Sequence, residues 1–497
     1  MFKERERGRF PLGSAIRLSS LSFQFPNPAN FAFLSLTKKM PLISERKYRR
    51  SPKTLSLLPT HKPDYCEPFQ SETGFDGASF SGAVFNLSTT VVGAGIMALP
   101  AAVKQLGLIP GLIMILLGAM LTESSIDILL RFTRVSKTSS YSSVVHDAFG
   151  DFGRILLQLC IVVNNTGMLI VYMIIIGDVL SGTWSEGVHY SGVIEEWFGQ
   201  RWWSTRSILL MLTTLLVFLP LISFKRVDSL RFTSALSVAL ALVFVAITAG
   251  VVIVKLINGS ISTPRLMPKF TGQESFWKLF TTIPILVTAY ICHHNVHPIE
   301  NELKDPSHMK LIVRTSLSLC STVYMATSLF GYLLFGDKTQ DDVLANFDGD
   351  LGVPFGSFLN DVVRVSYGIH LMLVFPIVFY SLRLNLDGLL FPHAIPFAFD
   401  SKRFYLVTVF LMSFIFVGAN FVPSIWDAFQ FTGATAAVGS GFIFPSAIAL
   451  RDTHGVATKK DKLLSWLMIF LAVSSSTVAI SSDLYSFFSG EEAAVGA

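Results

Sequence analysis

The sequence is poor in charged residues, and this shortage limits the kind of protein it encodes. Only 15% of the 497 residues are Asp, Glu, Lys or Arg, whereas about a quarter are charged in ordinary soluble proteins. Hydrophobic residues make up 51% of the chain, include 43 phenylalanines and gather in long blocks. This composition excludes a disordered chain and a soluble enzyme, and it predicts a polytopic membrane protein.

Cysteines and catalytic motifs are equally scarce. The four cysteines, Cys66, Cys160, Cys292 and Cys320, lie far apart, which excludes a disulfide framework and a four-cysteine zinc site. The sequence lacks the Gly-x-x-x-x-Gly-Lys-Ser/Thr loop that binds nucleotide phosphates, the His-Glu-x-x-His zinc motif and the Gly-x-Ser-x-Gly nucleophile elbow. We therefore expect no enzyme activity, no cofactor and no ATP-driven pumping by this chain alone.

Positive charge is concentrated near the N-terminus. Residues 1–72 hold 13 Lys and Arg against 6 Asp and Glu, and the remaining 425 residues hold 26 against 28. The net charge of +5 therefore does not indicate a basic groove, and we expect no nucleic-acid partner. The pattern predicts three regions: a disordered basic cytoplasmic tail over 1–75, a transmembrane domain over 76–490 and a short non-cytoplasmic tail over 491–497.

Eleven segments after this tail are apolar and long enough to cross a membrane, which takes about 20 helical residues. They lie near 77–103, 108–131, 154–180, 205–224, 229–255, 275–298, 312–336, 359–382, 404–424, 426–450 and 463–485. Basic residues collect in the tail and in the second, fourth and tenth loops, while the third and seventh loops are acidic. This alternation predicts a cytoplasmic N-terminus and a C-terminus on the opposite side.

The segments also form two sets of five with a nearly constant offset. Segments one to five and six to ten start 197 to 205 residues apart. Because five is an odd number, the second set must be inserted upside down relative to the first. We therefore predict an all-α membrane protein with a five-plus-five inverted repeat and one further terminal helix, an architecture of secondary transporters.

The first segment of each set carries residues that interrupt a helix. Gly93, Gly95 and Pro100 follow closely in segment one, and Pro284 and Pro298 lie in segment six. Unwound backbone at membrane depth is costly unless it faces a cavity where its freed donors and acceptors meet a ligand. Two such breaks in corresponding segments predict one central binding site.

An α-amino acid has the chemistry for such a site, because its carboxylate suits helix-starting amides and its ammonium suits helix-ending carbonyls. The amides that we assign to the carboxylate belong to Gly93, Ala94 and Gly95, and the carbonyls that we assign to the ammonium lie near Thr90, Val91, Ala289 and Tyr290. Asn164, Asn165 and Tyr172 of segment three could line the substrate path, and the alternative for Asn164 and Asn165 is that they only form hydrogen bonds between helices. The alternative for Gly93 and Gly95 is that they serve close helix packing alone.

Two stretches resemble known signatures. Phe85-Asn86-Leu87-Ser88 leading to Gly93-Ala94-Gly95-Ile96, and Cys292-His293 followed by Val296, Pro298-Ile299 and Glu302-Leu303, are similar to the first- and sixth-span motifs of the amino acid/auxin permease family. The resemblance covers about 76–490 and is closest to the sodium-coupled neutral amino acid transporters and the vacuolar amino acid transporters of fungi and plants. It implies eleven spans in a LeuT-like fold, amino acid transport by alternating access, and a vacuolar membrane location.

One departure from the family concerns the coupling ion. Sodium-coupled relatives have Asn where this chain has Thr89, and hydroxyl groups where it has Met372, Val374 and Phe375 before Pro376. Sodium needs a cage of oxygen ligands that apolar side chains cannot supply. The resemblance thus implies protons rather than sodium as the coupling ion, with an amino acid and the lipid bilayer as the other partners.

Several ionisable residues within the segments are candidates for proton coupling, because charge at membrane depth is usually functional. They are Glu123, His293 and His297. Glu123 and Asp127 could instead form an interfacial pair that meets water, and Asp361 with Arg364 could form an intrahelical ion pair. The alternative functions are an ion or metal transporter that uses the Cys292–His297 cluster, although we predict no metal site there, and an amino-acid-sensing membrane scaffold.

Overall fold

The computed structural model describes residues 77–497 except 186–187, 262, 270–272, 350, 397–398, 423–431 and 496–497. The predicted basic tail over 1–75 lies outside the described residues. The predicted C-terminal tail over 491–497 lies partly within them, where the last helix continues to Val495.

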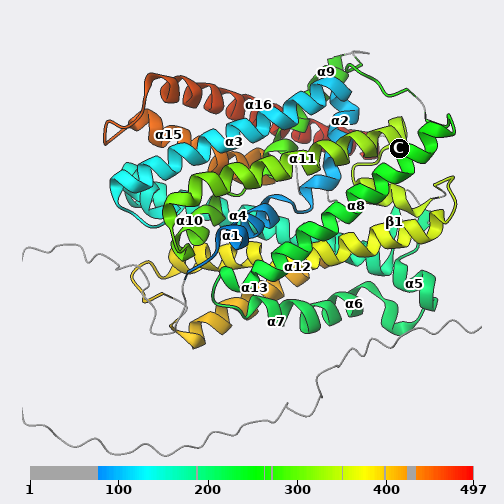
Figure 1. Ribbon diagram of the computed structural model, residues 1–497, viewed down its shortest axis with the longest axis horizontal. Helices are drawn as coiled ribbons and strands as arrows, with labels where there is room; N and C mark the ends of the chain where they lie inside the picture. Colours follow the sequence, from blue (N-terminus) through cyan, green and yellow to red (C-terminus); the bar gives the residue numbers. More distant parts are fainter. Residues whose placement is uncertain are drawn as a thin grey trace, which may run out of the picture. The chain divides into compact units, whose positions relative to one another are not determined.

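The described chain is helical apart from one small hairpin of strands β1 (Thr183–Ser185) and β2 (Val188–Tyr190). Long helices lie side by side over much of their lengths (Figure 1). The helices are α1 (Phe80–Val91), α2 (Gly95–Leu106), α3 (Leu108–Ser136), α4 (Tyr141–Ser181), α5 (Val193–Phe198), α6 (Arg206–Thr213), α7 (Leu219–Ile222), α8 (Arg231–Ile257), α9 (Gln273–Tyr290), α10 (His293–Glu302), α11 (Met309–Phe335), α12 (Gly356–Leu390), α13 (Ser401–Phe421), α15 (Phe444–Arg451) and α16 (Lys459–Val495).

Eight helical stretches of the described chain are long and apolar enough to cross a membrane, and the bent pair α1 and α2 makes up to nine. The prediction of an all-α, polytopic membrane protein is confirmed at this level. A shorter apolar stretch, Arg206–Ile222, coincides with the predicted fourth segment. The predicted sixth segment is divided into α9 and α10. Eleven spans and the inverted repeat remain predictions.

Local sequence explains where several helices begin and bend. Ser79 and Ser140 cap α1 and α4, since each side chain accepts a backbone N–H three residues ahead. Near its start α4 turns sharply at Gly150, whose φ of 68° is open to glycine but costly for other residues. Two π-helical turns, Gly433–Ala437 and Gly439–Ile443, precede α15, and such turns are frequent at functional sites.

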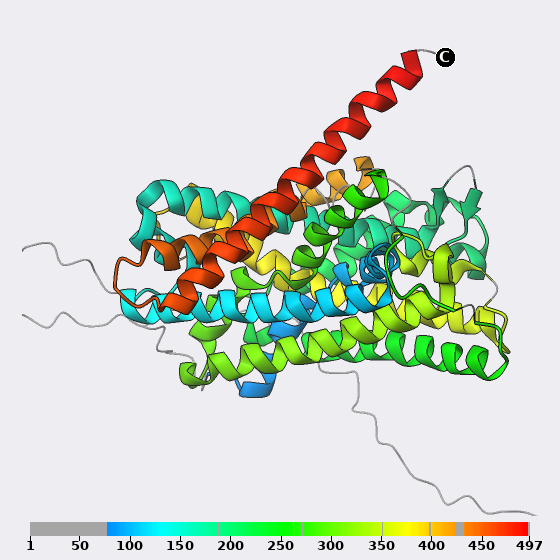
Figure 2. The ribbon, with the colours of Figure 1, turned by 90° about the horizontal axis from the view of Figure 1, so that it is seen from above.

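The larger core cluster surrounds the bent pair and joins it to α4, α8, α11 and α12. A second cluster joins α3, the start of α4, α15 and α16, and α16 extends past its neighbours (Figure 2). Large apolar side chains are exposed on outer helices, for example Leu406 and Phe410 on α13 and Phe470 on α16. Exposed apolar faces of this kind are what contact with lipid requires.

Candidate functional site

The first helix break lies where the glycines predicted it. α1 ends at Val91 and α2 begins at Gly95, with the two axes bent by 54°. Val92 leaves the helical conformation with φ −78° and ψ 92°. The amides at the start of α2 and the carbonyls at the end of α1 therefore converge on a short segment of unwound backbone, Val92–Ala94.

Both glycines of this break permit close approaches. A Cβ atom on Gly93 would overlap the Tyr172 hydroxyl of α4 and lie 2.9 Å from its Cζ. A Cβ atom on Gly95 would lie 2.9 Å from the Ala289 Cα of α9. Packing is thus one role of these glycines, and it brings α4 and α9 against the break.

Tyrosine hydroxyls hold the carbonyls that the break frees. Tyr367 of α12 donates to the Gly93 carbonyl at 2.7 Å. Tyr324 of α11 lies 2.6 Å from the Val91 carbonyl and 2.7 Å from the Ala289 carbonyl. One hydroxyl has one hydrogen, so Tyr324 can serve only one of these two carbonyls fully at a time. Sequence reasoning missed both tyrosines.

The second break separates α9 from α10. It consists of Ile291 and Cys292, and Cys292 has φ −141° and ψ 2°. The Asn295 amide donates back to the Cys292 carbonyl at 3.0 Å, which starts α10. The Asn295 side chain donates to the Thr90 hydroxyl at 3.0 Å and so connects the two broken helices.

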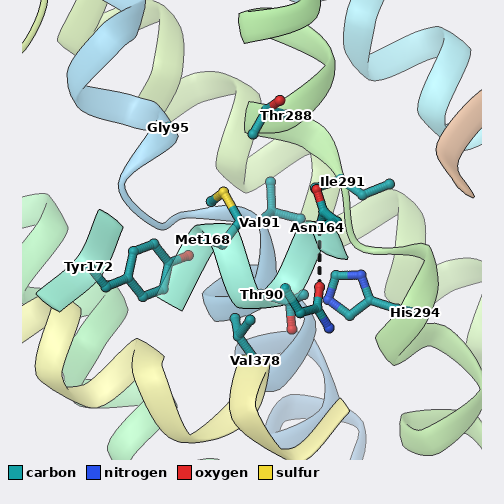
Figure 3. A pocket seen from close by; sticks show the side chains of 11 residues that line it. Thr90, Val91, Gly95, Asn164, Met168, Tyr172, Thr288, Ile291, His294 and Val378 are labelled. Carbon is teal, nitrogen blue, oxygen red and sulfur yellow. Dashed lines mark hydrogen bonds between the residues drawn. The ribbon is translucent and has the colours of Figure 1, made fainter. Parts of the chain in front are cut away.

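A cavity lies between the two breaks and α4 (Figure 3). Its lining comes from α1, α2, α4, α9, the second break, α10 and α12, and the space is narrow, with room for about one water molecule. The lining residues are Thr90, Val91, Gly95, Asn164, Asn165, Met168, Tyr172, Thr288, Ile291, His294 and Val378.

Three polar atoms of this lining have no hydrogen-bond partner among the described residues. They are Asn164 Oδ1, Asn165 Nδ2 and His294 Nε2, while Asn164 Nδ2 donates to Asn165 Oδ1 at 3.1 Å. The amide orientations are assigned from this bond. All three side chains are buried, and a buried polar group without a partner costs about 1–3 kcal/mol. The cavity therefore offers an acceptor, a donor and an imidazole nitrogen to a polar ligand.

The predicted binding residues divide into two sets. Thr90, Val91, Gly95 and Asn165 line the cavity, whereas Gly93 and Ala94 form the break, and Ala289 packs on Gly95. The Tyr290 hydroxyl lies 3.0 Å from Ser321 of α11, outside the cavity lining. His294, Thr288 and Val378 were not predicted as binding residues; the proline and histidines near the second break were the available signal for His294.

The three coupling candidates also lie outside the cavity lining. Glu123 forms a half-exposed ion pair with Arg314 at 2.9 Å. His293 Nε2 lies 3.1 Å from the Ser125 hydroxyl of α3. His297 Nε2 lies 2.8 Å from the Thr133 hydroxyl, also on α3. The described residues contain no group of three His, Cys, Asp or Glu that could hold a metal ion, so the Cys292–His297 cluster is not assembled as a metal site.

The expected Asp361–Arg364 pair is replaced by contacts to the segment around α5. Arg364 pairs with Glu196 at 2.9 Å and with Asp348 at 3.4 Å, while Asp361 accepts from the Trp197 indole at 3.0 Å. Burial raises the pKa of Glu196, against the opposing effect of Arg364. These contacts fasten α5 over the end of α12 that the loop charges predict to be non-cytoplasmic.

A second set of contacts joins helix ends on the predicted cytoplasmic side. The Glu302 carboxylate at the end of α10 accepts the Val227 and Asp228 amides at 2.9 and 2.6 Å. Next to it, Ala78 and Leu303 form a parallel β-bridge. The Glu302-Leu303 part of the sixth-span signature thus ties α10 both to the start of α1 and to the loop before α8.

Comparison with known proteins gives consistent results. The signature of the family described as "Transmembrane amino acid transporter protein" matches residues 76–483. Two relatives from Arabidopsis thaliana, the amino acid transporters AVT6B and AVT6A, are each 62% identical over 416 and 414 residues; both alignments cover 83% of this chain, and 91% and 90% of those proteins.

Solved structures share the fold at low identity. The structure of MhsT in complex with L-phenylalanine matches with a TM-score of 0.51 and 12% identity, covering 82% of this chain and 99% of that one. A manganese transporter from Eremococcus coleocola, in complex with an aromatic bis-isothiourea compound, matches with a TM-score of 0.52 and 12% identity, covering 82% and 87%. These likenesses support the predicted LeuT-like fold. The sequence matches show that the chain belongs to the transmembrane amino acid transporter family, a family of carriers and not of enzymes.

Proposed function

We propose that this chain is a secondary active transporter that moves amino acids by alternating access and binds one amino acid in the cavity between the two helix breaks. The observation that carries the proposal is the set of unpartnered polar atoms on Asn164, Asn165 and His294 beside two interrupted helices. A zwitterion would satisfy these atoms, whereas an apolar solute would leave them unpaired.

In this proposal the substrate carboxylate binds the amides of Gly93, Ala94 and Gly95 together with Asn165 Nδ2. The partial positive charge at the start of α2 favours an anion there. The ammonium binds Asn164 Oδ1 and the carbonyls near Thr90, Val91, Ala289 and Tyr290. Tyr324 already contacts the Val91 and Ala289 carbonyls, so substrate binding would compete with this hydroxyl.

We further propose that protons drive transport. The positions expected to supply sodium ligands are already engaged or apolar: the Thr89 hydroxyl donates to the Ser234 carbonyl at 3.0 Å, Val374 is fully buried, and Phe375 stacks on Phe218 with ring centroids 4.0 Å apart. Glu123, His293 and His297 remain candidates for the proton path.

The finer architecture and the location belong to the same proposal. α6 to α7 would be the fourth of eleven spans, and α9 with α10 the sixth, which completes an inverted repeat of five and five with α16 as the terminal helix. The tail over 1–75 would lie in the cytoplasm. The resemblance to vacuolar transporters favours the vacuolar membrane.

The test is uptake of a labelled amino acid mixture into proteoliposomes that contain the purified chain, with proton and sodium gradients imposed separately. We expect accumulation with a proton gradient and no stimulation by sodium. Uptake that requires sodium would refute proton coupling and leave the binding site standing. Absence of amino acid uptake under both gradients would refute the carrier proposal and favour the sensing scaffold.

A further inference from the structure

His370 lies at a junction that the sequence did not reveal. It is in the middle of α12, has no exposed surface and reaches Ser237 of α8. The Val92 carbonyl of the first break also lies beside the imidazole. A buried, titratable ring therefore sits where the unwound end of α1 meets α8 and α12.

The geometry defines which ring nitrogen carries the hydrogen. His370 Nδ1 lies 2.8 Å from the Ser237 carbonyl oxygen. The Ser237 hydroxyl lies 3.0 Å from the same nitrogen. Because a carbonyl can only accept and makes the shorter contact, we assign the hydrogen to Nδ1, which leaves Nε2 of the neutral ring with a lone pair. Nε2 is buried and has no hydrogen-bond partner in the part of the chain that the structure describes. The imidazole is thus a proton acceptor with its accepting nitrogen unoccupied.

The same three helices hold the break at two further points. Thr89 donates to Ser234 of α8, and Tyr367, one turn before His370, donates to Gly93. His370 stacks on Tyr367 with ring centroids 5.0 Å apart. A change of charge at His370 would therefore act directly on the contacts that fix α1 against α8 and α12.

Tyr367 is the titratable neighbour of His370 on the same helix, and it interacts with Asp342, which precedes the 3-10 turn Val343–Asp348, and with Tyr172 of α4. α8 contacts the ring with Ser237, and the first break, which follows α1, approaches it with Val92; neither residue titrates. Within the described part of the chain no ion pair joins an acid to His370.

We propose that His370 Nε2 is the proton-binding site that couples the proton gradient to amino acid transport, a proposal that rests on the function proposed above. A proton from the acidic side binds Nε2 and turns the ring into a double donor. The protonated ring then has two donors beside the first break, where the Val92 carbonyl lies near the imidazole, and this favours one position of α1. Release of the proton to the other side removes that bond and favours the other position.

The test compares wild type with His370→Gln in proteoliposomes. Glutamine keeps a donor but cannot take up a proton. We expect His370→Gln to lose about tenfold or more of the accumulation driven by a proton gradient, while amino acid exchange at equal pH on both sides stays within about threefold of wild type. The matched control is His308→Gln, a half-exposed histidine outside the cavity and the break, which should accumulate like wild type.

Each outcome bears on one proposal. If wild type takes up no amino acid, the proposed function fails. If wild type accumulates amino acid and His370→Gln accumulates it equally well, or loses exchange as strongly as accumulation, the coupling role of His370 is refuted. Should His370→Gln fail to fold, Ser237→Ala tests the role of His370 instead, because it keeps the imidazole but removes a hydroxyl 3.0 Å from Nδ1. The pH midpoint of its substrate binding should shift, and an unchanged midpoint would refute the proposal.

Discussion

The two helix breaks are built by different means. The first, Val92–Ala94, is made by glycines and contributes backbone atoms only, and its carbonyls are held by tyrosines from other helices. The second, Ile291–Cys292, is followed by His293, His294 and Asn295, whose own side chains reach α3, the cavity and α1. The first break, Val92–Ala94, is a segment of backbone that side chains of other helices hold in place; we call it the backbone cradle. The second break instead extends its own polar side chains to neighbouring helices.

Because of this difference, the cavity can stay polar while the helices around it change position. At the first break, the end of α1 carries a partial negative charge and the start of α2 a partial positive charge, and neither depends on an ionisable side chain. The surrounding helices supply the bonds that fix it, and bonds of about 1 kcal/mol each can be exchanged for bonds to a substrate. The second break connects to its neighbours through side chains and can be altered one residue at a time.

The largest expected effect comes from filling the first break. Gly93→Ala places a Cβ atom on the Tyr172 hydroxyl, and overpacking of this kind costs about 1–3 kcal/mol. We expect transport in proteoliposomes to fall about tenfold or more while the protein still reaches the membrane. The control is Gly250→Ala in α8, where a Cβ atom meets nothing within 4 Å. Normal transport by Gly93→Ala would refute the cradle role of this break.

The next largest effect concerns the side-chain amide of Asn165, which lines the cavity beside the first break. Asn165→Ala removes the unpartnered Nδ2 that faces the cavity, and a hydrogen bond to a charged group contributes about 1.5–3 kcal/mol. We expect the KM for the amino acid to rise about tenfold or more with a smaller change in maximal rate. Asn420→Ala, at an exposed site on α13, serves as the control. An unchanged KM would remove Asn165 from the binding site.

A smaller effect separates the two tyrosines. Tyr324→Phe removes the hydroxyl that lies between the Val91 and Ala289 carbonyls, next to the two breaks, whereas Tyr367→Phe removes the hydroxyl that bonds Gly93 alone. Loss of one buried hydrogen bond costs about 1–3 kcal/mol. We expect thermal unfolding of the purified protein to shift downward for both variants, and further for Tyr324→Phe. The reverse order would contradict the view that one hydroxyl links the two breaks.

The sequence was sufficient for the features that depend on local chemistry. Apolar length predicted the membrane helices, and Gly93 and Gly95 marked the position where α1 ends. Pro284 and Pro298 did not mark the second break, because they lie inside α9 and α10 and the break falls between them at Ile291–Cys292. Thr90, Val91, Gly95 and Asn165 line the cavity between the breaks, and their role in substrate binding stays a prediction that follows from chain proximity to the glycines or from polarity within an apolar helix.

The remaining residues could not be predicted because their roles depend on distant partners. Tyr324 and Tyr367 lie 233 and 274 residues from the carbonyls they serve in the first break, and a tyrosine in an apolar helix does not reveal which group it bonds. His370 is 133 residues from Ser237. Conversely, Arg364 is close to Asp361 in sequence but pairs with Glu196, because the fold brings α5 over it.

The most direct test of the central claim is a structure of the purified chain in lipid nanodiscs saturated with a transported amino acid. We expect substrate density between the two breaks, with its carboxylate at the start of α2 and at Asn165, and its ammonium at Asn164. Density for the amino acid at another place, with the cavity between the breaks unchanged, would contradict the account.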